Sequence, residues 1–473
     1  MSPVYQGGLR RWWRTSGCQA GANLLAWLSA LLIRELGGRI GDLWTQRADS
    51  RRRSRRIRAE RRLIEILGEL RGPFVKIGQF ASLRYDVLSA ETREALASLQ
   101  DHVPPLAFGD IREIIEYELS SPLESHFQHF DPVAIGSASI GQVHRAHLED
   151  GTAVAVKVQY PWIAASVVSD LRIIRSGLWL FGTFTGRRIP QLQQLFTEFA
   201  AGLQEELDFT HEARCAEQIA LNLADDSSIL VPQVFHEQST SRVLTASYHE
   251  TVAIEREALE RQGIAVRPVL EALTRAYAKM VFVDGLFHAD PHPGNLYVVK
   301  EPDMATHPRV LFVDFGLSKR LEPQLRDAMR QGLYALLQRD VDAFVARMHE
   351  MGMIEAGATD QVHTAITSMF EQINASTSSH PDPENALGIA GSQVLGLKDQ
   401  AKLLLEETPG LQLPNDLLLY AKTLSYLFAL GDRLAPEVDL LRPALPYLLR
   451  FLAESPGSPA TRLNDRDEDP GDE

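Results

Sequence analysis

The sequence predicts an α+β fold with two lobes. In its first half, residues 154–158 alternate as a half-buried strand and follow a loop of small residues. Residues from about 251 to 454 instead carry long helical patterns. The chain has 473 residues, of which 45% are hydrophobic and 23% charged, which is typical of a globular protein too long for one compact core. Two lobes with extensions therefore fit the length and the order of the elements.

The most informative segment is the H-A-D-P-H-P-G-N motif at residues 288–295, which an apolar run connects to D-F-G at 314–316. A kinase-type site needs a carboxylate beside the attacking hydroxyl, then an amide oxygen and a second carboxylate to hold magnesium. Asp290, Asn295 and Asp314 supply these groups in that order. The segment therefore predicts a phosphoryl-transfer site, with Asp290 as catalytic base and the other two residues as magnesium ligands.

Two other interpretations of this segment remain open from the residues alone. It could be a loop punctuated by Pro and Gly, in which Asp and Asn cap helices. Alternatively, His288, Asp290 and His292 alternate as metal ligands of a phosphohydrolase would. The phosphohydrolase interpretation leaves Asn295 and Asp314 without a role.

A kinase-type site also requires a loop that covers the phosphates, upstream of a strand lysine. Residues 135–143, I-G-S-A-S-I-G-Q-V, match the G-x-G-x-x-G-x-V pattern except that Ala138 replaces the middle glycine. Alanine adds a methyl group and stiffens a loop whose amides should approach phosphates. A small-residue turn before a strand is the alternative. The expected nucleotide-binding positions are Gly136, Ser137, Ala138, Ser139, Gly141 and Val143.

Lys157 stands in the middle of the predicted strand, as in the V-A-I-K motif of kinases. A lysine on the core side of a strand is costly to bury unless it is paired, so it should contact a carboxylate and the nucleotide phosphates. If the strand lies at a sheet edge, Lys157 would face solvent instead. On the following helix, Glu205, Asp208 and Glu212 share one face, and helix geometry alone does not choose between them.

Together these residues resemble the UbiB/AarF atypical kinases, a family that supports biosynthesis of isoprenoid quinones such as ubiquinone. The residues 76–79, K-I-G-Q, resemble the family's K-x-G-Q motif, and residues 206–208 resemble its E-x-D motif. The resemblance spans about residues 55–449. It implies a two-lobed protein-kinase-like fold with a family-specific N-terminal helical extension, and it implies that Glu212 pairs with Lys157.

The resemblance further implies a kinase or ATPase that binds ATP or ADP with Mg²⁺ and acts on or near lipid quinone precursors, alongside quinone-biosynthesis enzymes. Asp290, Lys157 and Glu212 would be its catalytic residues. In this family the K-x-G-Q helix lies over the mouth of the active site, so Lys76 should approach the E-x-D segment. The implied regulatory residues are Lys76, Gly78, Gln79, Glu206 and Asp208.

Several departures and alternatives bear on function. Gly136 and Ser137 stand where many members of the family have alanine, which leaves the preference for ATP or ADP open. No A-P-E segment follows D-F-G, so the platform on which protein kinases bind peptides is missing. The first alternative function is a non-catalytic scaffold that binds nucleotide and lipid. The second is a conventional protein kinase.

Charge separates the two ends of the chain. The net charge of -14 argues against nucleic acid as a partner, whereas the first residues are basic. The apolar run at residues 23–33 is shorter than the roughly 20 residues that span a bilayer, but its flanking Trp and Arg suit a membrane surface. We therefore expect a cytoplasmic protein peripheral to the inner face of a membrane. A helix packed on the body and an organelle-targeting peptide are the alternatives.

The sequence predicts five segments along the chain. The first is basic and apolar and attaches to the membrane, the second is the helical extension with K-x-G-Q, and the third is the nucleotide-clamping lobe. The fourth is a helical lobe that carries the catalytic loop and D-F-G, and the fifth is a disordered acidic tail. In order, they are residues 1–54, 55–105, 106–250, 251–454 and 455–473.

Overall fold

A computed structural model describes residues 105–137, 140–161, 163, 171–172, 175, 197, 200–377, 404, 408 and 410–454. Three predicted segments lie outside these residues: the one expected to attach to the membrane, almost all of the helical extension, and the acidic tail. The predicted site residues Lys76, Gly78, Gln79, Ala138 and Ser139 lie outside them as well. The chain forms two compact units. The first unit comprises Met1–Ala213 and Gln233–Tyr248, and the second comprises Arg214–Pro232 and His249–Glu473.

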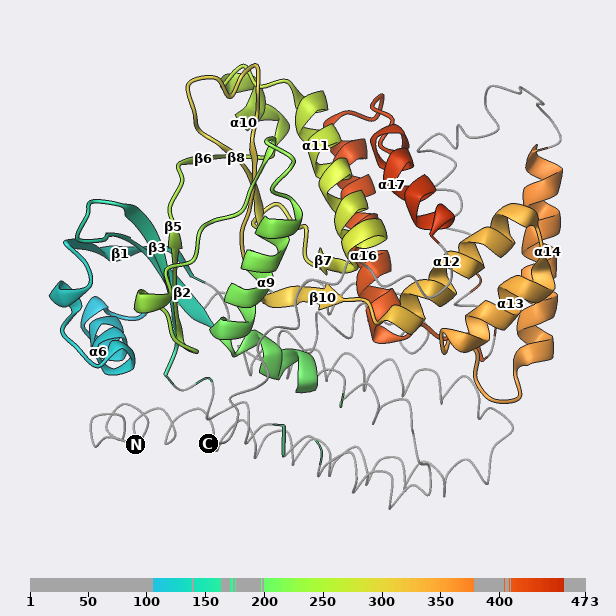
Figure 1. The fold of residues 1–473 in the computed structure, drawn as a ribbon, viewed down its shortest axis with the longest axis horizontal. Helices are drawn as coiled ribbons and strands as arrows, with labels where there is room; N and C mark the ends of the chain where they lie inside the picture. Colours follow the sequence, from blue (N-terminus) through green and yellow to red (C-terminus); the bar gives the residue numbers. More distant parts are fainter. Residues whose placement is uncertain are drawn as a thin grey trace, which may run out of the picture. The chain divides into compact units, whose positions relative to one another are not determined.

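The first unit contains a four-stranded antiparallel sheet in the order β1-β2-β3-β5, and the helix α6 (Phe108–Leu119) packs against it (Figure 1). The strands are β1 (His129–Ser137), β2 (Gly141–His147), β3 (Ala153–Gln159) and β5 (Val243–Ser247).

The alternation of β3 decides which of its side chains enter the core. Val154, Val156 and Val158 are fully buried and belong to the same cluster as Ile111 and Ile115 of α6. Because successive side chains on a strand point to opposite faces, Lys157 lies on the face away from this cluster. The apolar half of the pattern thus fixes the direction of the lysine.

The structure explains why a glycine occupies position 141 at the start of β2. A Cβ built at this position would lie 2.4 Å from the Val158 carbonyl oxygen on β3, so only glycine permits the two strands to approach this closely. Gly136 on β1 meets no such neighbour within 4 Å. The two glycines that matched one sequence pattern therefore have different surroundings.

The second unit holds a four-stranded sheet in the order β4-β9-β8-β6 and a two-stranded sheet of β10 and β7. Only β4 and β9 are paired in parallel. The strands are β4 (Ile229–Leu230), β6 (Thr251–Ala253), β7 (Leu286–His288), β8 (Leu296–Val299), β9 (Val310–Phe312) and β10 (Ser318–Arg320).

Helices make up most of the described part of the second unit (Figure 1). The helix α11 contacts both α16 and α17, while α12, α13 and α14 pack in succession. They are α10 (Arg256–Arg261), α11 (Val266–Ala278), α12 (Pro323–Gln338), α13 (Val341–Glu350), α14 (Thr359–Thr377), α16 (Asn415–Leu434) and α17 (Leu441–Ala453), with a π-helix, η4 (Lys279–Asp284), after α11.

The chain passes from one unit to the other more than once, near the predicted boundary between the two lobes. One change, after Tyr248, lies beside the predicted boundary at residue 250, but residues 214–232 also belong to the second unit. The first change falls within α9 (Phe209–Asn222), and β4 then joins the second unit because it pairs with β9. A two-residue strand whose partner lies some 80 residues later carries too little pattern to predict.

The mixture of sheets and helices confirms the predicted α+β class. The strongly apolar stretch at residues 417–430 forms part of α16, and Leu417, Leu418 and Leu427 are buried there. In the portion of the chain that the structure describes, we find no helix with the length and apolar character needed to cross a bilayer.

Candidate active site

The H-A-D-P-H-P-G-N segment forms a tight loop between β7 and β8. The Gly294 amide donates to Nδ1 of His292 at 2.8 Å, and the Tyr297 hydroxyl donates to the Gly294 carbonyl at 2.9 Å. A Cβ on Gly294 would lie 2.5 Å from the His292 ring, so glycine lets the ring fold back onto the loop. Because Nδ1 accepts a hydrogen bond, the neutral ring carries its proton on Nε2.

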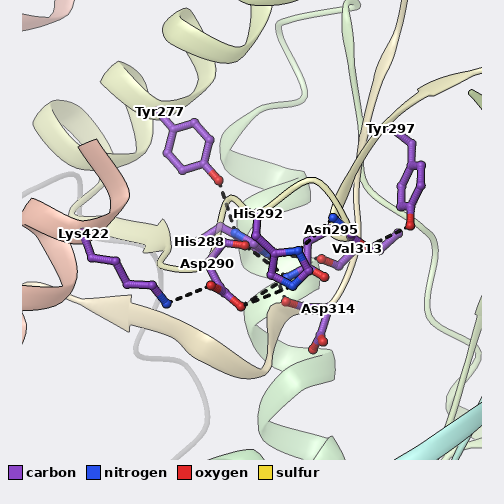
Figure 2. Close-up of polar contacts among 10 residues, drawn as sticks. Tyr277, His288, Asp290, His292, Asn295, Tyr297, Val313, Asp314 and Lys422 are labelled. Atoms are coloured by element: carbon purple, nitrogen blue, oxygen red, sulfur yellow. Dashed lines mark hydrogen bonds and ion pairs between the residues drawn. The ribbon is translucent and has the colours of Figure 1, made fainter. Parts of the chain in front are cut away.

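His288 is buried and links this loop to the D-F-G segment. Its Nε2 lies 3.2 Å from the Val313 carbonyl and 3.0 Å from that of Asp314, so this nitrogen carries the proton and donates. Its Nδ1 lies 3.2 Å from the Tyr277 hydroxyl, which donates to it (Figure 2). Burial lowers the pKa of His288 and keeps the ring neutral.

With both ring nitrogens engaged, His288 has no lone pair left for a metal. The phosphohydrolase interpretation therefore does not fit this site. His288 instead fixes the backbone at the position where the D-F-G segment begins.

Asp290 and Asn295 lie together in the loop. The Asn295 side-chain amide donates to the Asp290 carbonyl at 3.1 Å and lies 3.5 Å from the carboxylate oxygen Oδ2. Because the amide nitrogen makes both of these contacts, the amide oxygen of Asn295 is not the atom that contacts Asp290. His292 Nε2 lies 3.8 Å from the same Oδ2.

Lys422 of α16 is the partner of Asp290 that the sequence did not predict. Its Nζ lies 2.9 Å from the other carboxylate oxygen, Oδ1, and only 16% of its side chain and 20% of that of Asp290 are exposed. Figure 2 shows Lys422 reaching Asp290 from one side, while Asn295 and Asp314 lie on the other. The Lys422 ammonium also stands 5.6 Å from the ring centroid of Tyr426.

Lys422 keeps the Asp290 carboxylate ionised. Burial alone would raise the pKa of Asp290, but the attraction and hydrogen bond of Lys422, with smaller contributions from His292 and His288, bring it below its ordinary value. Asp290 is therefore an ionised carboxylate at neutral pH. A signal for Lys422 was present in the sequence, because it is a lysine within an apolar helical run, but nothing there named its partner.

Asp314 has an unusual backbone. Its φ of 62° and ψ of 75° lie in the left-handed region, which residues other than glycine adopt rarely. Strained backbone of this kind clusters at functional sites. The neighbouring residues hold it in place, since Val313 pairs with the Asn295 carbonyl and Phe315 packs edge-on against the His288 ring.

In the first unit, the structure brings Lys157 and Glu212 together. The Lys157 ammonium lies 2.8 Å from Oε2 and 3.0 Å from Oε1 of Glu212, and the exposed fractions of the two side chains are 15% and 5%. It also stands 5.0 Å from the centre of the Phe209 ring. Val143 faces Lys157 across the β2–β3 pair, so two of the expected nucleotide-binding residues share one face of the sheet.

The remaining predicted residues of this unit have diverse surroundings. Gly136 and Ser137 are exposed at the end of β1. Asp208 caps α9, because its carboxylate accepts from the amide and the hydroxyl of Thr210 at 3.0 and 2.7 Å. Gln159 of β3 donates to the Leu207 carbonyl at 2.9 Å, which ties the segment 206–208 to the sheet. Glu206 is half-buried there.

Comparison with known proteins identifies the family of the chain and its fold. The sequence model of the ABC1 atypical kinase-like domain matches residues 98–348. An uncharacterized protein of Synechocystis is 31% identical over 87% of this chain and 71% of its own length. A probable protein kinase UbiB of Erwinia tasmaniensis is 29% identical over 84% of this chain and 71% of its own.

Two further similarities extend to a plant protein and to a solved structure. Activity of BC1 complex kinase 8, a chloroplastic protein of Arabidopsis thaliana, is 30% identical over 80% of this chain, which spans about half (52%) of that protein. The Mycobacterium tuberculosis protein Rv3197, solved with erythromycin, has a TM-score of 0.55 at 22% identity, over 86% of this chain and all of that one. The fold is kinase-like, and the chain belongs to the ABC1 atypical kinase-like family.

Proposed function

We propose that this protein is a magnesium- and nucleotide-dependent atypical kinase or ATPase. The observation that carries the proposal is the set of groups around the catalytic loop, namely an ionised Asp290, an Asn295 whose amide nitrogen donates to the Asp290 carbonyl, and Asp314 on a strained backbone. A general base, an amide oxygen and a carboxylate in this order are what phosphoryl transfer requires.

The oxygens of Asn295 and Asp314 fit magnesium, which prefers hard oxygen ligands. When bound, the ion would neutralise charge on the phosphates of ATP or ADP. In the first unit, Lys157 would bind phosphate oxygens while Glu212 keeps its ammonium in position. Asp290 would accept the proton of the attacking hydroxyl or water as the new oxygen–phosphorus bond forms and the bond to the leaving nucleotide oxygen breaks.

We further propose that the acceptor belongs to quinone biosynthesis, on or near lipid quinone precursors at a membrane surface. The support is the kinship with a probable protein kinase UbiB and the resemblance of the motifs to that family. The regulatory role of Lys76, Gly78 and Gln79 beside Glu206 and Asp208 belongs to the same proposal, and so does peripheral attachment through the basic N-terminal segment.

Binding of ATP and of ADP by the purified full chain, measured with and without Mg²⁺, tests the proposal. We expect Asp314→Asn to abolish the magnesium dependence of binding, whereas Asp303→Asn, at an exposed position between β8 and β9, should leave it unchanged. An Asp314→Asn protein with unchanged magnesium dependence would contradict the metal assignment. Binding without turnover, with or without anionic liposomes, would favour a non-catalytic scaffold.

A further inference from the structure

Lys422 is outside every motif that predicted the site, yet it makes a close contact with the proposed base. Lys422 and Asp290 are separated by 132 residues, and the Nζ–Oδ1 distance is 2.9 Å. A lysine on a largely apolar helix is expensive to bury unless a carboxylate compensates its charge. The placement of Lys422 among the buried side chains Leu418, Leu419 and Thr423 of α16 is therefore explained by Asp290.

The position of Lys422 is fixed at more than one point. Tyr420, two residues before it on α16, packs edge-on against Phe287 of β7 with ring centroids 6.3 Å apart. Phe287 is fully buried and precedes Asp290 by three residues. One turn after the lysine, the Tyr426 ring lies 5.6 Å from Nζ. The helix is thus docked on the same strand that leads into the loop.

The two oxygens of Asp290 are used differently. Oδ1 contacts Lys422, whereas Oδ2 lies 3.5 Å from Asn295 Nδ2 and 3.8 Å from His292 Nε2. The terminal torsion of an Asp side chain is broad, so a carboxylate held at neither oxygen can rotate. A strong contact at Oδ1 restrains this rotation and leaves Oδ2 in longer contacts on the other side (Figure 2).

We propose that Lys422 is the positioning residue of Asp290. It holds the carboxylate by Oδ1, so that Oδ2 is oriented to receive the proton of the acceptor. Its positive charge also offsets the repulsion between an ionised base and the anionic phosphates that must approach it. This inference rests on the proposed function, because it assigns Lys422 a role only if Asp290 acts in turnover.

Four variants of the full chain test this role: Lys422→Met, Lys422→Arg, Asp290→Asn and the double variant of Asp290→Asn with Lys422→Met. Lys279→Met is the matched control. Lys279 also makes a buried pair in the second unit, with Asp284 at 3.1 Å and exposed fractions of 21% and 10%, but it lies outside the catalytic loop. Nucleotide affinity, kcat, KM for ATP and the thermal midpoint are measured for each.

We expect Lys422→Met to lower kcat by up to about 10²-fold, the scale of a misplaced catalytic group, with nucleotide affinity and KM nearly unchanged. Lys422→Arg keeps the charge and should recover much of the loss. Lys279→Met should keep wild-type kcat below its thermal midpoint. In the Asp290→Asn background, Lys422→Met should cause no further loss, because a residue that acts through Asp290 has nothing left to orient.

The outcomes separate this inference from the proposed function. Unchanged turnover in Asp290→Asn would overturn the proposed base itself. A large loss in Asp290→Asn with wild-type kcat in Lys422→Met would overturn only the role of Lys422, and so would losses that multiply in the double variant. If Lys422→Met does not fold, Lys422→Gln and Lys422→Arg apply the same test, and wild-type kcat in both contradicts the positioning role.

Discussion

Two half-buried lysines of this protein have similar surroundings but hold their carboxylates in different ways. Lys157 in the first unit and Lys422 in the second each contact a carboxylate at 2.8–2.9 Å and each stand over an aromatic ring. Glu212 faces Lys157 with both of its oxygens. Asp290 faces Lys422 with one oxygen and keeps the other toward the catalytic loop.

This difference fits two chemical roles. A carboxylate that contacts its lysine through both oxygens is suited to fix the ammonium in place, which is what a phosphate-binding lysine needs. A carboxylate that is restrained at one oxygen can still accept a proton at the other. Under the proposed function, Glu212 would anchor its lysine through two oxygens, whereas Asp290 would keep one oxygen for the reaction.

The largest effect on stability is expected at the pair in the first unit. Glu212→Gln removes the carboxylate that contacts Lys157 through both oxygens, and breaking a largely buried ion pair by removing one partner costs about 3–5 kcal/mol of unfolding free energy. Denaturant unfolding measures this loss. Glu124→Gln, in an exposed pair with Arg112, is the control and should leave the unfolding midpoint nearly unchanged. Equal midpoints for the two variants would contradict the anchoring role of Glu212.

Much of the first unit was predictable from the sequence, because its signals are local. Residues 154–158 were predicted to form a strand, and β3 extends one residue further at each end. The alternation of apolar residues along the strand also predicted which face of the sheet carries Lys157. Helix spacing left Glu205, Asp208 and Glu212 as equal candidates, and the family resemblance pointed to Glu212. The structure brings Glu212 to the lysine, while Asp208 caps the helix.

The second unit was less predictable because its contacts join distant segments. The hairpin of β8 and β9 and the order of the proposed catalytic residues follow from local pattern. The pairing of Lys422 with Asp290 does not, since helical periodicity shows that a residue lies in an apolar run but not what it meets. The hydrogen bonds of His288 were not predictable from the sequence either, because no sequence pattern marks its partners. They are a tyrosine hydroxyl and two backbone carbonyls.

A smaller effect is expected on acidification, and it should arise in both units. Burial lowers the pKa of His144 in the first unit and of His288 in the second. An unfolded histidine takes up a proton near pH 6.5, whereas a buried one with a lowered pKa does not, so the unfolded state binds more protons. Stability is therefore full above pH 6.5 and falls as the pH drops from there through the folded pKa.

The slope is at most about 1.4 kcal/mol per pH unit for each histidine. Unfolding free energies of wild type, His144→Gln and His129→Gln at pH 7 and pH 5 measure the contribution of the first unit. His144→Gln should lose less stability on acidification than wild type, and His129→Gln, at an exposed position, should behave as wild type. The same loss in all three proteins would contradict a contribution of His144.

The smallest effect on unfolding free energy is expected at the aromatic rings that the two lysines contact. Tyr426 is 41% exposed, so its attraction for the Lys422 ammonium should be worth no more than about 1 kcal/mol. Tyr426→Leu should lower the unfolding free energy by that amount at most. Phe209→Leu, at the fully buried ring beneath Lys157, should cost more, because it also leaves a cavity. Equal losses would mean that burial of the ring does not distinguish the two sites.

The 132 residues between Asp290 and Lys422 have a consequence for how the protein is made. A chain is synthesised from its N-terminus, so the catalytic loop leaves the ribosome well before its lysine. Until α16 is made and docked, Asp290 has no Lys422 to offset its charge or restrain its carboxylate. The proposed base is therefore completed late, and an unfinished chain that already carries the whole catalytic loop lacks the contact that orients it.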